Sequence, residues 1–144
     1  MSHSTPLLGY PDGIYQYIYN TALIVHPTHI FNAFHYRMPE CGILGLTLYG
    51  ASLNYWRYPK MKSWRRTFDM IIAKTTIAYH FYLSLSTPNK WITTVPITVG
   101  GSLYYVSIFL SNRGNIKTAA LCHALIHILV SLGASFTYRD YLRT

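Results

Sequence analysis

Charged side chains are scarce in this sequence of 144 residues, and acidic ones are scarcest. Lys, Arg, Asp and Glu make up 11% of the chain, against about 25% in ordinary soluble domains. A soluble protein of this length exposes much of its surface and needs charge to solvate it. Hydrophobic residues make up 51% instead. We therefore expect much of the surface to meet lipid, with residues 1–144 forming a single integral membrane domain.

Only four acidic residues stand against twelve Lys and Arg, which gives a formal charge of +8. In a soluble protein this balance would point to nucleic acid. Here the cations lie mostly in short loops between apolar runs, where they typically control membrane topology, so no nucleic-acid partner is expected. The two cysteines, Cys41 and Cys122, lie in separate apolar segments and form no metal motif. Residues 1–13 lack the layout of a cleaved signal.

Long apolar segments, each near the roughly 20 residues needed to cross a bilayer, predict a helical bundle. They cover residues 14–34, 41–56, 68–85, 91–110 and 117–136. Loops with Pro, Gly and Asn separate them. The first segment is either a kinked span or an interfacial helix, because it contains Asn20, His26, Pro27 and His29. The expected fold is an all-α polytopic bundle of about five transmembrane helices, with four plus one interfacial helix as the alternative.

Basic residues are unevenly divided between the two ends of such a bundle. We call the end at the N-terminus side A and the other end side B. The loops on side A contain seven cations, namely Arg57, Lys60, Lys62, Arg65, Arg66, Arg113 and Lys117. Side B has four, namely Arg37, Lys90, Arg139 and Arg143. The positive-inside rule then places side A and the N-terminus in the cytoplasm or its equivalent. The organelle stays open between endomembranes and the mitochondrial inner membrane.

Polar residues within apolar segments are candidates for function, because lipid makes them costly. Asp69, Thr76 and His80 share one stripe, since steps of seven and eleven residues return to nearly the same helix face. His123 and His127 lie one turn apart, a spacing typical of two ligands to one metal.

Counting residues from side A indicates where these groups meet. Ser52, Asp69 and His123 fall near side A, with His127 and His80 deeper. We therefore predict that Ser52, Asp69, His123 and His127 converge on one interior pocket near side A, with His80 close below. Histidines at similar depth on several helices suit zinc.

A structural interpretation of the same residues remains open. Asp69 follows Arg65 and Arg66, so a salt bridge at a helix N-terminus would also account for it. His123 and His127 could equally form hydrogen bonds between helices, and a lone histidine such as His80 is often structural.

Three of these motifs together resemble the CREST superfamily of membrane hydrolases, which includes alkaline ceramidases, progestin/adipoQ receptors and GPI-remodelling proteins. Ser52 lies near the end of one segment and Asp69 at the start of the next. His123 and His127 form a His-x-x-x-His motif in the last segment. In the superfamily a His follows the Ser by four residues, a position that Trp56 occupies here. The superfamily also has more spans than this chain.

The resemblance implies zinc-dependent hydrolysis of lipid amide or ester bonds. Histidines would hold zinc, and the Asp and Ser would assist an activated water. On this basis Ser52 and Asp69 are the expected catalytic residues, His123 and His127 are expected zinc ligands, and His80 is the candidate for the missing third ligand.

Two interpretations from other classes remain open. One is a non-catalytic accessory or scaffold subunit of a membrane complex, such as a respiratory-chain assembly, with other subunits as partners and no cofactor. The other is a b-type haem protein, with His80 and either His123 or His127 as axial ligands. Membrane lipids are expected partners of all three.

Overall fold

The structure is a computed structural model, and it describes residues 10–142. Within this range the chain forms five helices and no strand. They are α1 (Tyr15–His35), α2 (Pro39–Trp56), α3 (Trp64–Ser84), α4 (Lys90–Asn112) and α5 (Ile116–Tyr141). The expected all-α fold is confirmed, and each predicted segment coincides with one helix. The connections are short, at residues 36–38, 57–63, 85–89 and 113–115.

The start of α3 differs from the predicted segment because a capping residue determines it. Ser63 caps α3, because its hydroxyl accepts a hydrogen bond from the backbone N–H of Arg66 at 3.3 Å. Arg65 and Arg66 therefore lie in the first turn of α3 rather than in the preceding loop. The first segment forms one continuous helix through Pro27, although proline removes a helical hydrogen bond.

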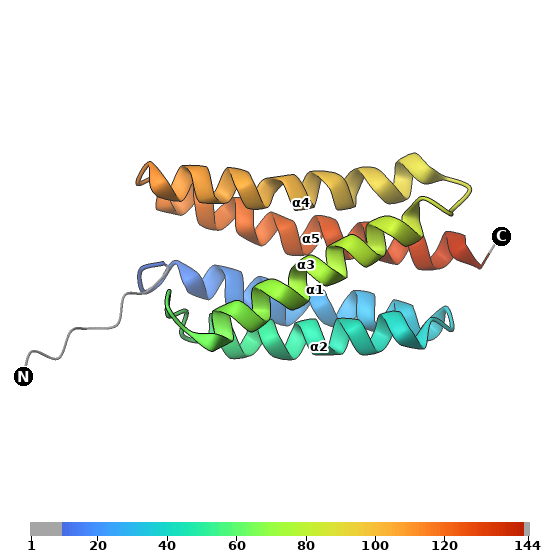
Figure 1. Ribbon diagram of the computed structural model, residues 1–144, viewed down its shortest axis with the longest axis horizontal. Coiled ribbons are helices and arrows are strands. Elements are labelled where there is room, and N and C mark those ends of the chain that lie inside the picture. Colours follow the sequence, from blue (N-terminus) through green and yellow to red (C-terminus); the bar gives the residue numbers. More distant parts are fainter. Residues whose placement is uncertain (1–9, 143–144) are drawn as a thin grey trace, which may run out of the picture.

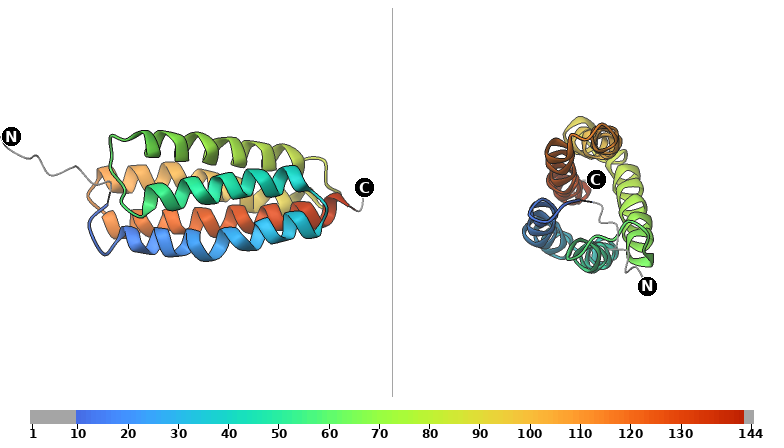
Figure 2. Two further views of the ribbon diagram at one scale, coloured as in Figure 1. Left: turned by 90° about the horizontal axis from the view of Figure 1, so that it is seen from below. Right: turned by 90° about the vertical axis from the view of Figure 1, so that its left-hand side faces the viewer.

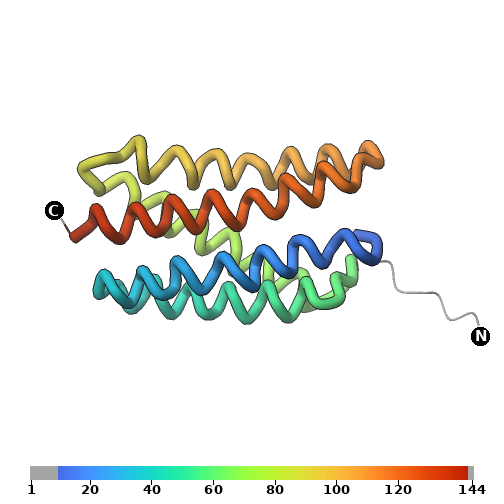
Figure 3. Tube along the Cα trace, turned by 180° about the vertical axis from the view of Figure 1, so that it is seen from behind, coloured from blue at the N-terminus to red at the C-terminus, as the bar shows by residue number. Residues whose placement is uncertain are grey.

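The five helices form a ring when the molecule is viewed along its length (Figure 2, right). Around this ring the order is α4, α5, α1, α2 and α3, with α3 next to α4. Helices α1, α3 and α5 run away from the N-terminal end, and α2 and α4 return to it (Figure 1). Seen from behind, α4 follows α5 along its length, and α1 follows α2 (Figure 3). Only α3 crosses obliquely, starting beside α2 and ending beside α4. The fold thus consists of two antiparallel pairs that pack directly on each other through α1 and α5, with the tilted α3 joining α2 to α4 on the other side.

Two of the five helices, α4 and α5, are long and apolar enough to cross a membrane by length and composition. The other three, α1, α2 and α3, do not meet this criterion. The rest of the protein covers α4 less than α5. In the most apolar stretch of each helix, 22% of the residues of α4 are buried, against 50% of those of α5.

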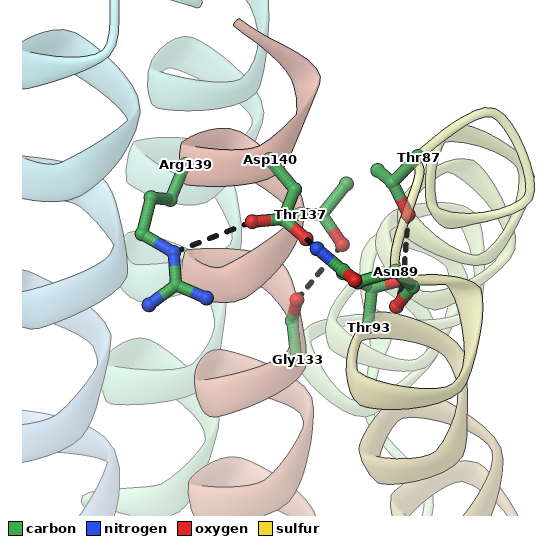
Figure 4. A network of polar contacts seen from close by, with 7 residues as sticks. All are labelled: Thr87, Asn89, Thr93, Gly133, Thr137, Arg139 and Asp140. Atoms are coloured by element: carbon green, nitrogen blue, oxygen red, sulfur yellow. Dashed lines mark hydrogen bonds and ion pairs between the residues drawn. The ribbon is translucent and has the colours of Figure 1, made fainter. Parts of the chain in front are cut away.

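A polar network at side B holds the end of α5 against the loop before α4 (Figure 4). Asp140 is fully buried and accepts hydrogen bonds from Asn89 Nδ2 at 2.8 Å and from Arg139 Nε at 3.3 Å. Arg139 is partly exposed, so charge–charge attraction adds little to this pair. The buried carboxylate is a fixed acceptor that ties two chain segments together.

Candidate functional site

A cavity of about 460 Å³ lies inside the ring of helices. Its volume is in the range of small-molecule sites, roughly 300–1,000 Å³. All five helices contribute to its lining, which is mostly apolar. Exposed residues of α3 and α4 also line it, namely Lys74, Ala78, Ser102 and Tyr105. The cavity therefore opens sideways between α3 and α4.

The predicted site residues all line this one cavity: Ser52, Asp69, His80, His123 and His127. The expected convergence is present, and the chemical roles of the five residues stay predictions. Two histidines of α1, His26 and His29, join them in the lining.

Ser52 and Asp69 form a short polar contact at the site. Ser52 Oγ donates a hydrogen bond to Asp69 Oδ1 at 2.6 Å, and both side chains are buried. Helix α2 delivers Ser52 near its end, and the cap at Ser63 starts α3 early enough to place Asp69 within its second turn. A hydroxyl bonded to a carboxylate is a strong, charge-assisted contact. The pair is therefore preorganised on the cavity wall.

The predicted alternative partner of Asp69 lies elsewhere. Arg65 donates to the backbone carbonyl of Asn54 at 3.2 Å, and within residues 10–142 Asp69 forms no ion pair. The salt-bridge interpretation of Asp69 is therefore wrong.

Four imidazoles from α1 and α5 pack edge to face beside this pair. The ring centroids of His26 and His127 lie 4.9 Å apart, those of His26 and His29 5.3 Å, and those of His123 and His127 5.5 Å. His26 and His29 are nearly completely buried, at 2% and 3% exposure. A chain of neighbouring histidines thus runs across the interior from α1 to α5.

Several nitrogens of this cluster have no hydrogen-bond partner within the described part of the chain. They are Nδ1 and Nε2 of His26, Nε2 of His29 and Nε2 of His127. An unsatisfied buried polar group costs about 1–3 kcal/mol, and such groups in proteins usually have a partner such as water, an ion or a ligand. The cluster, whose histidines line the cavity, therefore has unused hydrogen-bonding or ligating capacity.

His29 differs from the other three, because its ring is held on both sides. Its Nδ1 lies 2.9 Å from Ser131 Oγ. Its Nε2 lies against Gly45 of α2, where an added Cβ would be only 3.0 Å away. His29 thus fills the junction of α1, α2 and α5.

His80 lies in the cavity lining but is fully engaged by its own chain. Its Nδ1 lies 2.7 Å from the carbonyl oxygen of Thr76, and its Nε2 is hydrogen-bonded to the hydroxyl of Tyr138. Both His80 and Tyr138 have no exposed surface. His80 therefore has no free nitrogen in this arrangement for zinc or for haem, and it acts as a polar link between α3 and α5.

Trp56 occupies the position at which the CREST pattern has a histidine. Its indole packs edge to face on His123, with ring centroids 4.7 Å apart. It is nearly buried, at 3% exposure, and its Nε1 has no partner within residues 10–142. The indole fills the space beside His123 and excludes another ligand from that side.

A zinc ion fits part of the donor set. The unpartnered Nε2 of His127 and the adjacent His123 suit a metal that prefers neutral imidazoles. His80 does not fit, for the reason just given. Across residues 10–142, no three His, Cys, Asp and Glu side chains already surround a common metal position.

The sequence pointed weakly to His26 and His29. Both lie beside Pro27 in a segment that reads equally well as an interfacial helix, and neither forms an i, i+4 pair with another histidine. Their i, i+3 spacing places both on one face of the helix. This spacing was the feature of the sequence that could have indicated a shared site.

Comparison of the chain with models of protein families, with curated proteins and with solved structures gave no match.

Proposed function

We propose that this chain is an integral membrane hydrolase that cleaves amide or ester bonds of lipids in its interior cavity. The observation that carries the proposal is the hydrogen bond between Ser52 and Asp69, buried in a cavity that also contains unpartnered histidine nitrogens. A structural polar cluster would be expected to satisfy its own donors and acceptors, as His80 and Tyr138 do.

The membrane setting is supported by the outer surface of all five helices. Each of them has exposed large apolar side chains outside the cavity lining, such as Ile24, Phe31, Ile43, Ile71, Phe109 and Leu121, which are 52–72% exposed. Exposed apolar surface on this scale needs lipid or protein to cover it. Two helices are apolar enough to span, and with short connections we extend this to a bundle of five spans. Side A, with the basic loop 57–63, faces the cytoplasm or its equivalent in this proposal.

The side opening between α3 and α4 is suited to a lipid substrate. A lipid could enter from the bilayer without passing through water, with its acyl chain against apolar residues such as Met70 and Ile77. Lys74 lies on the rim and points toward Tyr104, with its ammonium 5.8 Å from the ring centroid. A cation at this place would attract a headgroup phosphate or a carboxylate.

In the proposed reaction, Asp69 transfers the proton and Ser52 stabilises the negative charge. Asp69 accepts a proton from water as the water oxygen bonds to the carbonyl carbon. In the resting state Ser52 donates its only proton to Asp69, so its hydroxyl is held in place. Once Asp69 is protonated, that hydroxyl is free to turn and stabilise the developing oxyanion. Asp69 then passes the proton to the leaving nitrogen or oxygen as its bond to carbon breaks, and an acid and an amine or alcohol result.

His123 and His127 would hold zinc beside this pair. When bound, zinc acidifies water and polarises carbonyl groups. The mostly apolar cavity wall limits the access of bulk water, which strengthens the electrostatic interactions inside.

Lipid hydrolysis by the purified chain tests the proposal. The protein in detergent is incubated with ceramide as an amide and a lysophospholipid as an ester, and released fatty acid is measured. Asp69→Asn is expected to lower the rate by at least 100-fold, because general acid–base catalysis contributes about 10²–10⁴. Asp12→Asn is the matched control, since Asp12 is exposed and lies outside the cavity lining. Activity equal in Asp69→Asn and the wild type, or absent from the wild type on both lipids, would overturn the proposal.

A further inference from the structure

We propose that His26 of α1 is the third zinc ligand, together with His123 and His127 of α5. The inference deepens the proposed function and rests on it for the use of this cavity. It assigns a role to a residue outside both sequence motifs.

His26 is the least satisfied polar side chain of the interior. It is 2% exposed, lines the cavity, and has no hydrogen-bond partner at either ring nitrogen within residues 10–142. Three other buried histidines differ from His26. His80 is hydrogen-bonded at both ring nitrogens. The ring of His29 is held between Ser131 and Gly45, and His127 lacks a hydrogen-bond partner at Nε2.

The ring spacing agrees with a shared metal. Imidazole nitrogens about 2.0–2.1 Å from one tetrahedral zinc ion place their ring centroids roughly 5 Å apart. The centroid distances here are 4.9 Å for His26 and His127 and 5.5 Å for His127 and His123. The rings now meet edge to face, at 84° and 62°, so ligation of one ion by all three requires rotation of their side chains.

The surroundings favour His26 over the other candidates for the third position. Trp56 covers His123 on the side where the CREST pattern has its remaining histidine. Helix α1 contributes His26, whose ring contacts that of His127. The fourth position of the metal would face the cavity, which also contains Asp69 and its carboxylate. Three neutral imidazoles with one open position are a known catalytic zinc arrangement.

Gly45 provides a second, independent way to disturb the cluster. An added Cβ would lie 2.9 Å from Ile30 Cγ1 and 3.0 Å from His29 Nε2. His29 packs on His26 with centroids 5.3 Å apart. Gly45→Ala therefore pushes the ring that supports His26 without removing any ligand, so zinc affinity should fall less than on loss of His26 itself.

Metal binding by the full chain in detergent tests the inference. The protein is stripped with a chelator and titrated with zinc, and with cobalt as a spectroscopic probe. The wild type is expected to bind one equivalent, with the intense visible absorption of tetrahedral cobalt. His26→Phe replaces the ring without its nitrogens and is expected to weaken zinc binding by more than about 100-fold, since even loss of an outer partner costs 10–100-fold. His35→Phe is the control on the same helix, because His35 is exposed and outside the cavity lining.

The outcomes separate this inference from the proposed function. Unchanged zinc affinity and cobalt spectrum in His26→Phe, with loss in His127→Phe, would overturn the role of His26 and leave the hydrolase proposal intact. A folded wild type that binds no zinc would overturn the metal site. If that protein still released fatty acid from lipid, the proposed function would stand without a metal. Should His26→Phe fail to fold, His26→Gln replaces it under the same criteria.

Discussion

Replacement of Gly133 by alanine should separate α4 from α5. An ideal Cβ on Gly133 would lie 2.6 Å from Ile97 Cγ1, 3.1 Å from the carbonyl oxygen of Thr93 and 3.2 Å from the backbone nitrogen of Ile97. A side chain such as Ile97 can rotate away, but two of the three atoms belong to the backbone of α4. The two helices must therefore move apart by a few tenths of an ångström along their shared contact.

The magnitude follows from two opposing terms. Overpacking of a tight interior contact costs about 1–3 kcal/mol. Replacing Gly by Ala in a helix interior gains up to about 1 kcal/mol through helix propensity. For Gly133→Ala the contacts with backbone atoms place the overpacking cost at the upper end of its range. We therefore expect the free energy of unfolding to fall by about 1–2 kcal/mol.

Gly101→Ala is the matched control on the neighbouring helix. Its added Cβ would meet only Ile77 Cγ2, at 3.6 Å, which is ordinary van der Waals contact. That variant keeps the propensity gain without the clash and should be as stable as the wild type or slightly more stable. With about 2–4 °C in midpoint per kcal/mol for a domain of this size, the two variants should differ by roughly 2–12 °C.

The assay is thermal loss of helical circular dichroism for each full-length variant in the same detergent. Gly133→Ala melting at or above the midpoint of Gly101→Ala would refute the close approach of α4 and α5 at this glycine. The same comparison tests the role in helix packing that small residues commonly have in membrane proteins.

Two further predictions concern the network at side B and the cavity rim. Asp140→Ala removes the buried acceptor shared by Asn89 and Arg139 and should cost about 2 kcal/mol, since hydrogen bonds to charged groups contribute about 1.5–3 kcal/mol. A thermal midpoint within 1 °C of wild type would contradict this, against an expected fall of roughly 4–8 °C. Lys74→Gln removes the rim cation and should raise KM for an anionic lipid about 2- to 5-fold, the effect of losing an exposed ion pair of about 0.5–1 kcal/mol. KM for a zwitterionic lipid should stay unchanged, and an equal rise for both lipids would refute selective headgroup recognition.

The helices themselves could be predicted from the sequence because their signals are local. Apolar segments bounded by Pro, Gly and Asn predicted all five helices. Two boundaries differ by several residues: α3 begins at Trp64 instead of Phe68, where Ser63 caps it, and α5 ends at Tyr141 instead of Phe136. The shared pocket could also be predicted, since helical phase and alternating direction determine the depth of Ser52, Asp69 and His127. What helical phase does not determine is rotation of one helix against its neighbours.

This limit explains the outcomes for single residues. His80 lies at the predicted depth, yet Tyr138, 58 residues later in the chain, binds its second nitrogen. His26 lies at a similar depth and has no such partner within residues 10–142. Partners at such sequence distance depend on side-chain packing, so the sequence alone could not separate an engaged histidine from an available one.

The most direct test of the central claim is an experimental structure of the protein with a bound fatty acid, the acid product of the proposed reaction. The account predicts that the carboxylate lies within hydrogen-bond distance of Ser52 or of the histidine cluster, and that the acyl chain leaves between α3 and α4 past Lys74. A cavity that excludes the fatty acid, or a fatty acid bound only on the outer helix faces, would contradict the claim that this interior site acts on lipids.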